Sequence, residues 1–115
     1  MREEKAPAVY IMASRYRGTL YVGVTSALWN RVAEHKNERY TGFTSTYGVK
    51  SLVWYEHHHN MDDAIRREKQ IKAWKREWKF RIIETMNPDW LCLHDNIDTI
   101  ATLVDPKAGP LPSQG

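Results

Sequence analysis

Two short apolar segments near the start of the chain constrain its fold more than any other feature. Residues 8–13 (AVYIMA) and 20–24 (LYVGV) are rich in strand-forming side chains. A brief connection that includes Gly18 separates them, and glycine is typical of turns. Two strands joined so closely are typical of an antiparallel hairpin. The sequence therefore predicts a fold that starts with a hairpin.

A helix and a third strand are predicted after the hairpin. Ser26 is the better candidate for the helix N-cap. The helix is expected over residues 27–36, where Leu28 and Val32 are four residues apart and share an apolar face. Residues 52–56 (LVWYE) have the composition of a strand.

The second half of the chain is predicted to be mainly helical. Asn60 can cap a helix that begins near Met61 and continues past Trp74. We expect a break near residues 75–77 and a further helical stretch that ends ahead of Pro88. The predicted order is β-β-α-β-α-α. This order indicates an α/β (α+β) fold, with a small three-stranded, mostly antiparallel sheet flanked by helices.

The length of the chain indicates one domain. A chain of 115 residues can bury one modest core. We expect residues 1–7 to form a polar lead-in and residues 8–95 to form the domain. Residues 96–115 would be a C-terminal extension, which its prolines and glycines make flexible from about residue 104.

The composition excludes several classes of protein. Cys92 is the only cysteine, so an intrachain disulfide is excluded, which fits a reducing compartment. No stretch approaches the roughly 18 apolar residues that a membrane span needs, and no apolar signal-peptide core follows the N-terminus. We therefore expect a cytoplasmic protein without a membrane partner.

Basic residues are concentrated in one segment. The chain has a formal net charge of only +3, but residues 66–81 hold eight basic and two acidic side chains. A basic helix beside aromatic residues suits a polyanion such as nucleic acid. The alternative is an ordinary solvated helix face. The basic side chains are Arg66, Arg67, Lys69, Lys72, Lys75, Arg76, Lys79 and Arg81.

Glu68 does not fit a simple amphipathic pattern. On the helix that begins near Met61, it lies inside an apolar stripe between Ala64 and Ile71. Burying an unpaired carboxylate is costly, so Glu68 should be paired, protonated or bound to a metal ion. Two interpretations stay open: a buried salt bridge to an arginine such as Arg31, or a metal ligand or catalytic acid.

Other polar groups accompany this carboxylate. Tyr10 and Tyr21 each lie in the middle of a predicted strand, so strand pairing can bring both phenols to one face, and Gly23 leaves space beside them. Arg31 and His35 are four residues apart on a polar helix face. Taken singly, these are half-buried aromatics and a surface pair. Together with the inward carboxylate they contain the parts for metal-assisted phosphoryl transfer.

Two tripeptides carry a resemblance to a known family. Residues 8–10 (AVY) and 21–23 (YVG), with eleven residues from one tyrosine to the other, resemble the paired motifs of the GIY-YIG nuclease superfamily, although alanine replaces the first glycine. The resemblance covers roughly residues 7–93 and is closest to small stand-alone, YhbQ-like members and to the N-terminal domain of the repair protein UvrC. Arg31, His35, Glu68 and Asn87 fall where the family carries its arginine, a histidine or tyrosine, its metal-binding glutamate and its last-motif asparagine.

The resemblance implies a divalent-metal-dependent endonuclease that hydrolyses DNA, with a setting in DNA repair or recombination. Glu68 would hold one Mg²⁺ or Mn²⁺ ion with waters in the other positions. Tyr21 would act as general base, with His35 as the alternative because imidazole has a more suitable ordinary pKa than phenol. Arg31 would bind a phosphate oxygen. Tyr10 and Asn87 would orient water, metal or phosphate.

The expected partner is nucleic acid, with DNA favoured over RNA. The basic segment and the loop over residues 39–50, with Tyr40, Phe43 and Tyr47, would hold its backbone and unstacked bases. The oligomeric state is left open, and a protein partner could supply specificity. The expected nucleic-acid-binding residues are Tyr47, Arg66, Arg67, Lys69, Lys72, Lys75 and Arg76.

Three alternatives stay open. The chain could bind nucleic acid without useful catalysis, which the basic segment supports equally well. His57, His58 and His59 could form a transition-metal site, although adjacent residues on an extended segment point in alternating directions and lack the ligand spacing of zinc sites. The chain could also be a partner-dependent subunit, with Trp74 and Trp78, four residues apart, in an exposed aromatic patch.

Overall fold

The structure is a computed structural model that describes residues 6–37 and 47–97. The start of the predicted lead-in, as far as residue 5, lies outside the described residues. So do Tyr40 and Phe43 of the predicted binding loop, and the part of the predicted extension beyond residue 97.

A three-stranded antiparallel sheet forms the centre of the fold. Strand β1 spans Ala8–Ala13, β2 spans Leu20–Thr25 and β3 spans Ser51–His57. Their order in the sheet is β2-β1-β3, and both pairings are antiparallel. The predicted hairpin, the predicted third strand and the antiparallel sheet are therefore confirmed.

Three helices and a short 3₁₀ turn complete the described fold. Helix α1 spans Leu28–Lys36, α3 spans Met61–Lys72, α4 spans Arg76–Met86, and the 3₁₀ turn η1 spans His94–Asn96. A break between α3 and α4 was predicted, but it lies slightly earlier than expected: α3 ends at Lys72 and does not continue past Trp74, and α4 starts at Arg76. The predicted element order and α+β class are confirmed. No helix in the described parts of the chain is long and apolar enough to cross a membrane.

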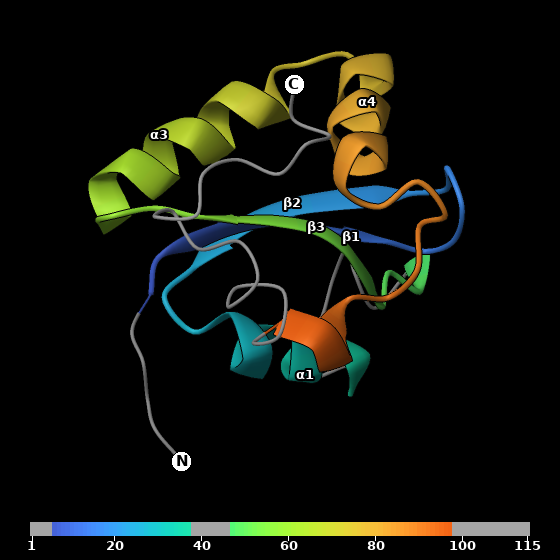
Figure 1. Cartoon of the computed structure of the whole chain (residues 1–115), viewed down its shortest axis with the longest axis horizontal. Coiled ribbons are helices and arrows are strands. Elements are labelled where there is room, and N and C mark those ends of the chain that lie inside the picture. The colour runs from blue at the N-terminus through green and yellow to red at the C-terminus, as the bar shows by residue number, and fades with distance from the viewer. Residues whose placement is uncertain (1–5, 38–46, 98–115) are drawn as a thin grey trace.

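The sheet separates two cores. All six residues of β1 are buried, as expected for a strand covered on both faces. Tyr10 and Met12 share a core with Val32 of α1, whereas Val9 and Ile11 belong to the core beneath α3 and α4. Alternate side chains of a strand point to opposite faces, so β1 contributes to both cores. Figure 1 shows α1 on one side of the sheet and α3 and α4 on the other.

The two edges of the sheet differ. The chain after α4 runs beside β3, where the Leu93 amide donates to the Leu52 carbonyl at 2.8 Å. It then reaches α1, because the His94 ring lies 4.6 Å from the Trp29 ring, centroid to centroid. Strand β2 forms the opposite edge, and α3 packs over both β2 and β1.

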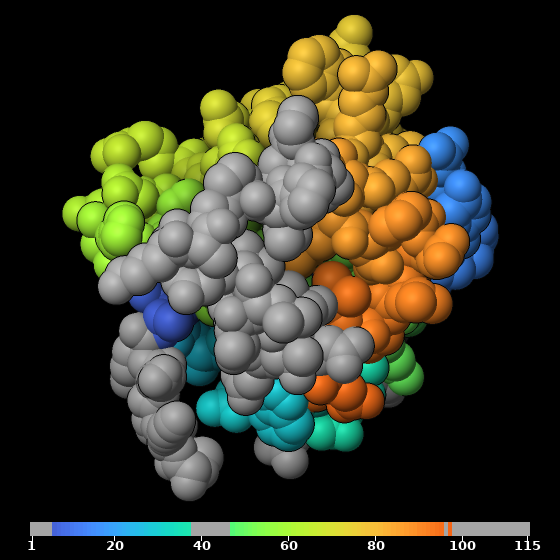
Figure 2. All heavy atoms as spheres, in the orientation of Figure 1, coloured from blue at the N-terminus to red at the C-terminus, as the bar shows by residue number. Residues whose placement is uncertain are grey.

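The tip of the β1–β2 hairpin is docked on α4. Arg17, in the turn, donates two hydrogen bonds to Glu84, each at 3.0 Å. Arg76 donates to the carbonyls of Arg17 and Gly18 at 3.1 and 3.2 Å. Figure 2 shows the hairpin turn, in blue, against α4, in gold and orange. The position of the hairpin therefore depends on α4 as well as on the sheet.

The two predicted helix caps have different outcomes. Asn60 caps α3 as predicted, because its Oδ1 accepts the Asp63 amide at 2.8 Å. The prediction that Ser26 caps the first helix was wrong: Ala27 is the cap residue and no side chain caps the helix. The physical reason lies one residue earlier, where the Thr25 hydroxyl accepts the Ala27 amide at 3.0 Å and turns the chain out of β2.

Candidate active site

Three aromatic side chains meet on the α1 side of the sheet. The Tyr10 hydroxyl oxygen and His35 Nε2 are hydrogen-bonded at 3.1 Å. The Tyr21 ring lies 6.2 Å from the Tyr10 ring and 5.2 Å from the His35 ring, centroid to centroid. We call Tyr10, Tyr21 and His35 the ring cluster. It brings together one residue from each of three consecutive elements, β1, β2 and α1.

Strand register explains how the two tyrosines meet. Tyr10 is paired with Gly23 and Met12 with Tyr21, so both phenols lie on one face, as the sequence predicted. Gly23 is needed for this packing. A Cβ atom at Gly23 would lie 2.6 Å from the Cζ and hydroxyl oxygen of Tyr10, which is closer than atoms can approach without a shift.

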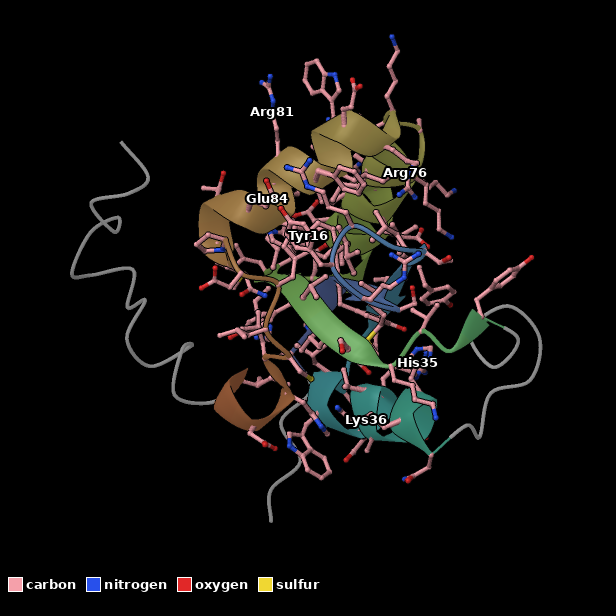
Figure 3. All side chains as sticks on the ribbon, turned by 90° about the vertical axis from the view of Figure 1, so that its right-hand side faces the viewer. Tyr16, His35, Lys36, Arg76, Arg81 and Glu84 are labelled. Atoms are coloured by element: carbon pink, nitrogen blue, oxygen red, sulfur yellow. The ribbon has the colours of Figure 1, made fainter. Side chains whose placement is uncertain are left out.

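The helix places His35 differently from the prediction. His35 was expected on a polar face with Arg31, but its side chain is only 2% exposed. It follows Leu28 and Val32 on the buried face of α1, at the spacing of successive turns. The expectation of a surface pair was wrong because this face continues under Tyr10. Figure 3 shows His35 on α1, below the sheet.

Burial sets the charge of the His35 ring. Loss of solvent, together with the positive charge of Arg31 and against the opposing charge of Glu34, lowers the pKa of His35 from 6.5 to about 4. The imidazole is therefore neutral at neutral pH. A neutral ring can form one hydrogen bond with the Tyr10 hydroxyl, as acceptor or as donor according to its tautomer.

Arg31 and Tyr21 are the more accessible members of this region. The Arg31 side chain is 35% exposed and its Nε lies 3.4 Å from Glu34 Oε1. Tyr21 is half-buried on the edge strand, whereas Tyr10 is completely buried. A ligand that approaches the outer edge of β2 can therefore meet Tyr21 before Tyr10 or His35.

Glu68 lies on the other side of the sheet. Its helix, α3, contributes Ala64 and Ile71 to the core beneath α3 and α4, and the Glu68 side chain is 12% exposed. Its partner is Lys72, whose Nζ lies 2.7 Å from Glu68 Oε2. The suggested salt bridge to Arg31 was therefore wrong. Spacing of four residues on one helix favours Lys72, a signal that the sequence contained.

The position of β2 decides how Glu68 and the ring cluster could act together. α1 and α3 cover opposite faces, and α3 packs on β2, which is an edge strand. The outer edge of β2 therefore offers a route from one group to the other. A single ligand could contact both by wrapping around this edge.

Asn87 is separate from the ring cluster and holds the chain after α4. Its Nδ2 donates to the carbonyls of Val53 and Leu91 at 3.1 and 2.8 Å, and its Oδ1 accepts the Leu91 amide at 3.0 Å. Asn87 is 5% exposed. These bonds join the end of α4 to β3, so the structure gives Asn87 an architectural function and no contact with the other predicted site residues.

Comparison with known proteins identifies the family. The sequence pattern of the GIY-YIG catalytic domain matches residues 6–81. The chain belongs to the GIY-YIG family. A domain of this family implies nuclease-type activity on DNA, and the ring cluster is built from its two tripeptides and the helix that follows them.

Relatives of this GIY-YIG chain include small bacterial proteins. A UPF0213 protein of Staphylococcus haemolyticus is 33% identical over 76 residues, which are 66% of this chain and 92% of the relative. A UPF0213 protein of Staphylococcus epidermidis is 30% identical over 67 residues, or 58% of this chain and 82% of the relative. Their names state no activity. No solved structure matches the chain significantly.

The donor set fits one kind of metal ion. Among the described residues, no group of three or more histidine, cysteine, aspartate or glutamate side chains could hold a metal. Glu68 offers a single, mostly buried carboxylate, which already forms an ion pair with the Lys72 ammonium. One carboxylate suits an ion that keeps most of its waters, such as Mg²⁺, and not a closed zinc site.

In the run of three histidines, His58 Nε2 contacts Glu56 Oε1 at 2.8 Å.

The predicted nucleic-acid-binding residues fall into two groups. Arg67 and Arg76 are engaged within the protein: Arg67 donates to Glu56 at 2.9 Å, and Arg76 holds the hairpin tip. The others have exposed side chains and, among the described residues, form no ion pair with another element: Arg66 and Lys72 pair only with Asp63 and Glu68 of their own helix, and Tyr47 is 55% exposed. This exposed group is Tyr47, Arg66, Lys69, Lys72 and Lys75.

Proposed function

We propose that this chain is a divalent-metal-dependent endonuclease that hydrolyses phosphodiester bonds in DNA. The observation that supports this function best is the ring cluster. The residues of two family motifs, Tyr10 and Tyr21, contact each other and a buried, neutral His35. Ordinary core packing does not need a tyrosine hydroxyl and an imidazole hydrogen-bonded out of water, whereas a site that holds a neighbouring proton-transfer group in a fixed orientation does.

Within this site we assign proton transfer from water to Tyr21, acting as the phenolate. An ordinary phenol is protonated at neutral pH, so the positive charges of the metal and Arg31 would have to favour release of the phenol proton to solvent before the phenolate accepts one from the attacking water. Tyr21 is half-buried on the edge strand, where a ligand can reach it, whereas His35 is 2% exposed. The low pKa of His35, about 4, also makes it a weak proton acceptor. We therefore assign Tyr10 and His35 to positioning: their hydrogen bond fixes the rings against which Tyr21 packs. Arg31 would bind a phosphate oxygen and offset the charge of the transition state.

We assign the metal to Glu68. A bound Mg²⁺ or Mn²⁺ would supply electrostatic stabilisation of the charge that develops on the phosphate and leaving oxygens. Glu68 would hold this ion through its carboxylate, and Lys72 would either leave the carboxylate or balance its charge beside the ion. The low exposure of Glu68 would keep bulk water from screening these charges.

A second function is binding of DNA without useful cleavage. The observation that favours it is the ion pair of Lys72 with Glu68 at 2.7 Å. If this ammonium held the carboxylate permanently, no metal would bind there, and the exposed basic residues of α3 would still attract a polyanion.

Cleavage of labelled DNA with the variant Glu68→Gln tests the first function against the second. The substrates are single-stranded, duplex, flap and branched DNAs, the last two being the structures that repair and recombination produce. Each is incubated with Mg²⁺, Mn²⁺ or EDTA. We expect metal-dependent cleavage that Glu68→Gln slows by about a hundredfold or more, since a metal contributes several kcal/mol to such a step.

The matched control is Glu77→Gln, which removes an exposed carboxylate from α4. It should cleave like the parent protein. Binding of Mn²⁺, followed by electron paramagnetic resonance, should be lost in Glu68→Gln and kept in Glu77→Gln. Intact DNA under every condition, with unchanged DNA binding in Glu68→Gln, would establish the second function.

A further inference from the structure

An exposed aromatic ring lies at the corner where α3 gives way to α4. Trp78, in the first turn of α4, is 56% exposed. Its ring lies 6.1 Å from that of Trp74, centroid to centroid, with 50° between the planes. Trp74 packs against the core and lies under the guanidinium of Arg67 at 5.4 Å. One side of Trp78 is therefore supported while much of its surface faces solvent.

The surroundings of Trp78 are basic. Residues 69–79 contain five basic side chains and one acidic side chain, Glu77. Lys72 and Lys75 are exposed beside the corner. Helix α4 starts at the same place without a side-chain cap, so the dipole of its first turn adds to the positive potential. An aromatic ring that is supported on one side and surrounded by cations suits a nucleic acid, which offers both phosphates and bases, better than it suits the apolar surface of a partner protein.

The corner is continuous with the proposed catalytic carboxylate. Lys72 Nζ contacts Glu68 at 2.7 Å, and Lys79 Nζ donates to the Lys72 carbonyl at 3.5 Å. Trp78 is the chain neighbour of Lys79, so these contacts connect the corner to Glu68 through Lys79 and Lys72. Figure 1 shows the α3–α4 turn on the outer side of the helical layer, and Figure 2 shows atoms of this region projecting at the top of the molecule.

We propose that Trp78 is a stacking platform for an unpaired nucleotide of the substrate, with Lys72 and Lys75 on its phosphates. Bases inside a duplex are stacked on each other and cannot reach a ring on a projecting corner, whereas bases of a single strand can. The preferred substrate class is therefore DNA with a single-stranded segment next to the cleaved bond. The cleavage part rests on the proposed function, but the binding part does not.

Binding without cleavage tests the platform. Fluorescence anisotropy in EDTA compares a labelled oligothymidylate with a labelled hairpin duplex, using the full chain. We expect Trp78→Ala to weaken binding of the oligothymidylate by about tenfold, in keeping with the loss of one stacked base, and to leave duplex binding within about twofold. Lys75→Gln should weaken both and reduce the dependence on salt.

Trp29→Ala is the matched control, because Trp29 is 53% exposed and lies on α1, on the other side of the sheet. It should bind both DNAs like the parent protein. Equal losses for Trp29→Ala and Trp78→Ala, or unchanged oligothymidylate binding in Trp78→Ala, would overturn the platform. In the second case, loss of self-association in Trp78→Ala on size exclusion would assign the corner to a protein contact instead.

The two proposals fail in different ways. A parent protein that cleaves no DNA but whose oligothymidylate binding depends on Trp78 keeps the platform and loses the nuclease. A protein that cleaves duplex and single strands equally well, with and without Trp78, keeps the nuclease and loses the platform.

Discussion

The His35 imidazole joins burial, charge and position in one residue. It lies against two tyrosines, is 2% exposed, and has its pKa lowered to about 4 by burial and by Arg31. The spacing of Leu28, Val32 and His35 could have predicted a buried face, but histidine in a helix is more often read as polar. The identity of the Tyr10 contact could not be predicted, because it depends on which strand lies under the helix.

Stability should depend on pH through His35. The unfolded chain binds a proton at an ordinary pKa near 6.5, but folded His35 binds it only near 4. The contribution of the neutral His35 ring to the free energy of unfolding is therefore fully present above pH 6.5 and is lost as the pH falls towards 4. The free energy of unfolding is measured with urea for the parent protein and for His35→Gln. The difference between the two should fall by on the order of 2 kcal/mol from pH 6.5 to pH 4. For His59→Gln, at an exposed site, the free energy of unfolding should change with pH as it does for the parent protein. The same pH dependence for His35→Gln would refute a stabilising role of the neutral His35 ring.

At the scale of elements, α4 holds the hairpin that presents both tyrosines. Glu84 accepts two hydrogen bonds from Arg17 in the hairpin turn and one from Trp90 Nε1 at 2.7 Å. Figure 3 shows Tyr16, Arg76 and Glu84 together where this turn meets α4. The Arg17 backbone has a φ of +53°, a conformation that a residue with a side chain keeps only when its surroundings fix it.

Local patterns predicted the elements but not this contact. Apolar runs and turn residues were enough for the strands, and Asn60 was enough for the start of α3. Arg17 and Glu84 are 67 residues apart, and nothing in either segment indicates the other. The start of the first helix shows a similar limit: the sequence offered Thr25 and Ser26 as caps, but the Thr25 hydroxyl accepts the Ala27 amide ahead of the helix and no side chain caps it.

Removal of the Glu84 carboxylate should loosen the hairpin. Glu84→Ala breaks the bonds to Arg17 and Trp90, so we expect the Tm to fall by several degrees, a shift typical of losing one such network in a domain of this size. Glu77→Ala on the same helix is exposed and should change the Tm little. Differential scanning calorimetry measures both. Equal Tm values for the two variants would mean that the tip is not anchored through Glu84.

At the scale of the whole molecule, the site residues are divided between two layers. The ring cluster lies with α1, and Glu68 lies with α3, with the edge strand β2 between them. The motifs predicted which residues to examine, and they did not reveal that the sheet separates them. Asn87, which the same motifs included, is used in the architecture of the β3 edge. Only the three-dimensional arrangement distinguishes Asn87, which supports the fold, from the motif residues of the ring cluster.

A double-mutant cycle on Tyr21 and Glu68 tests most directly whether both layers serve one site. Single-turnover cleavage is measured for the parent protein, Tyr21→Phe, Glu68→Gln and the double variant, on the best substrate of the DNA panel. Residues that act as a unit give losses that are far from additive. We therefore expect the double variant to cleave about as slowly as the slower single variant. Losses that multiply, or a single variant as fast as the parent protein, would contradict a shared site around the edge of β2.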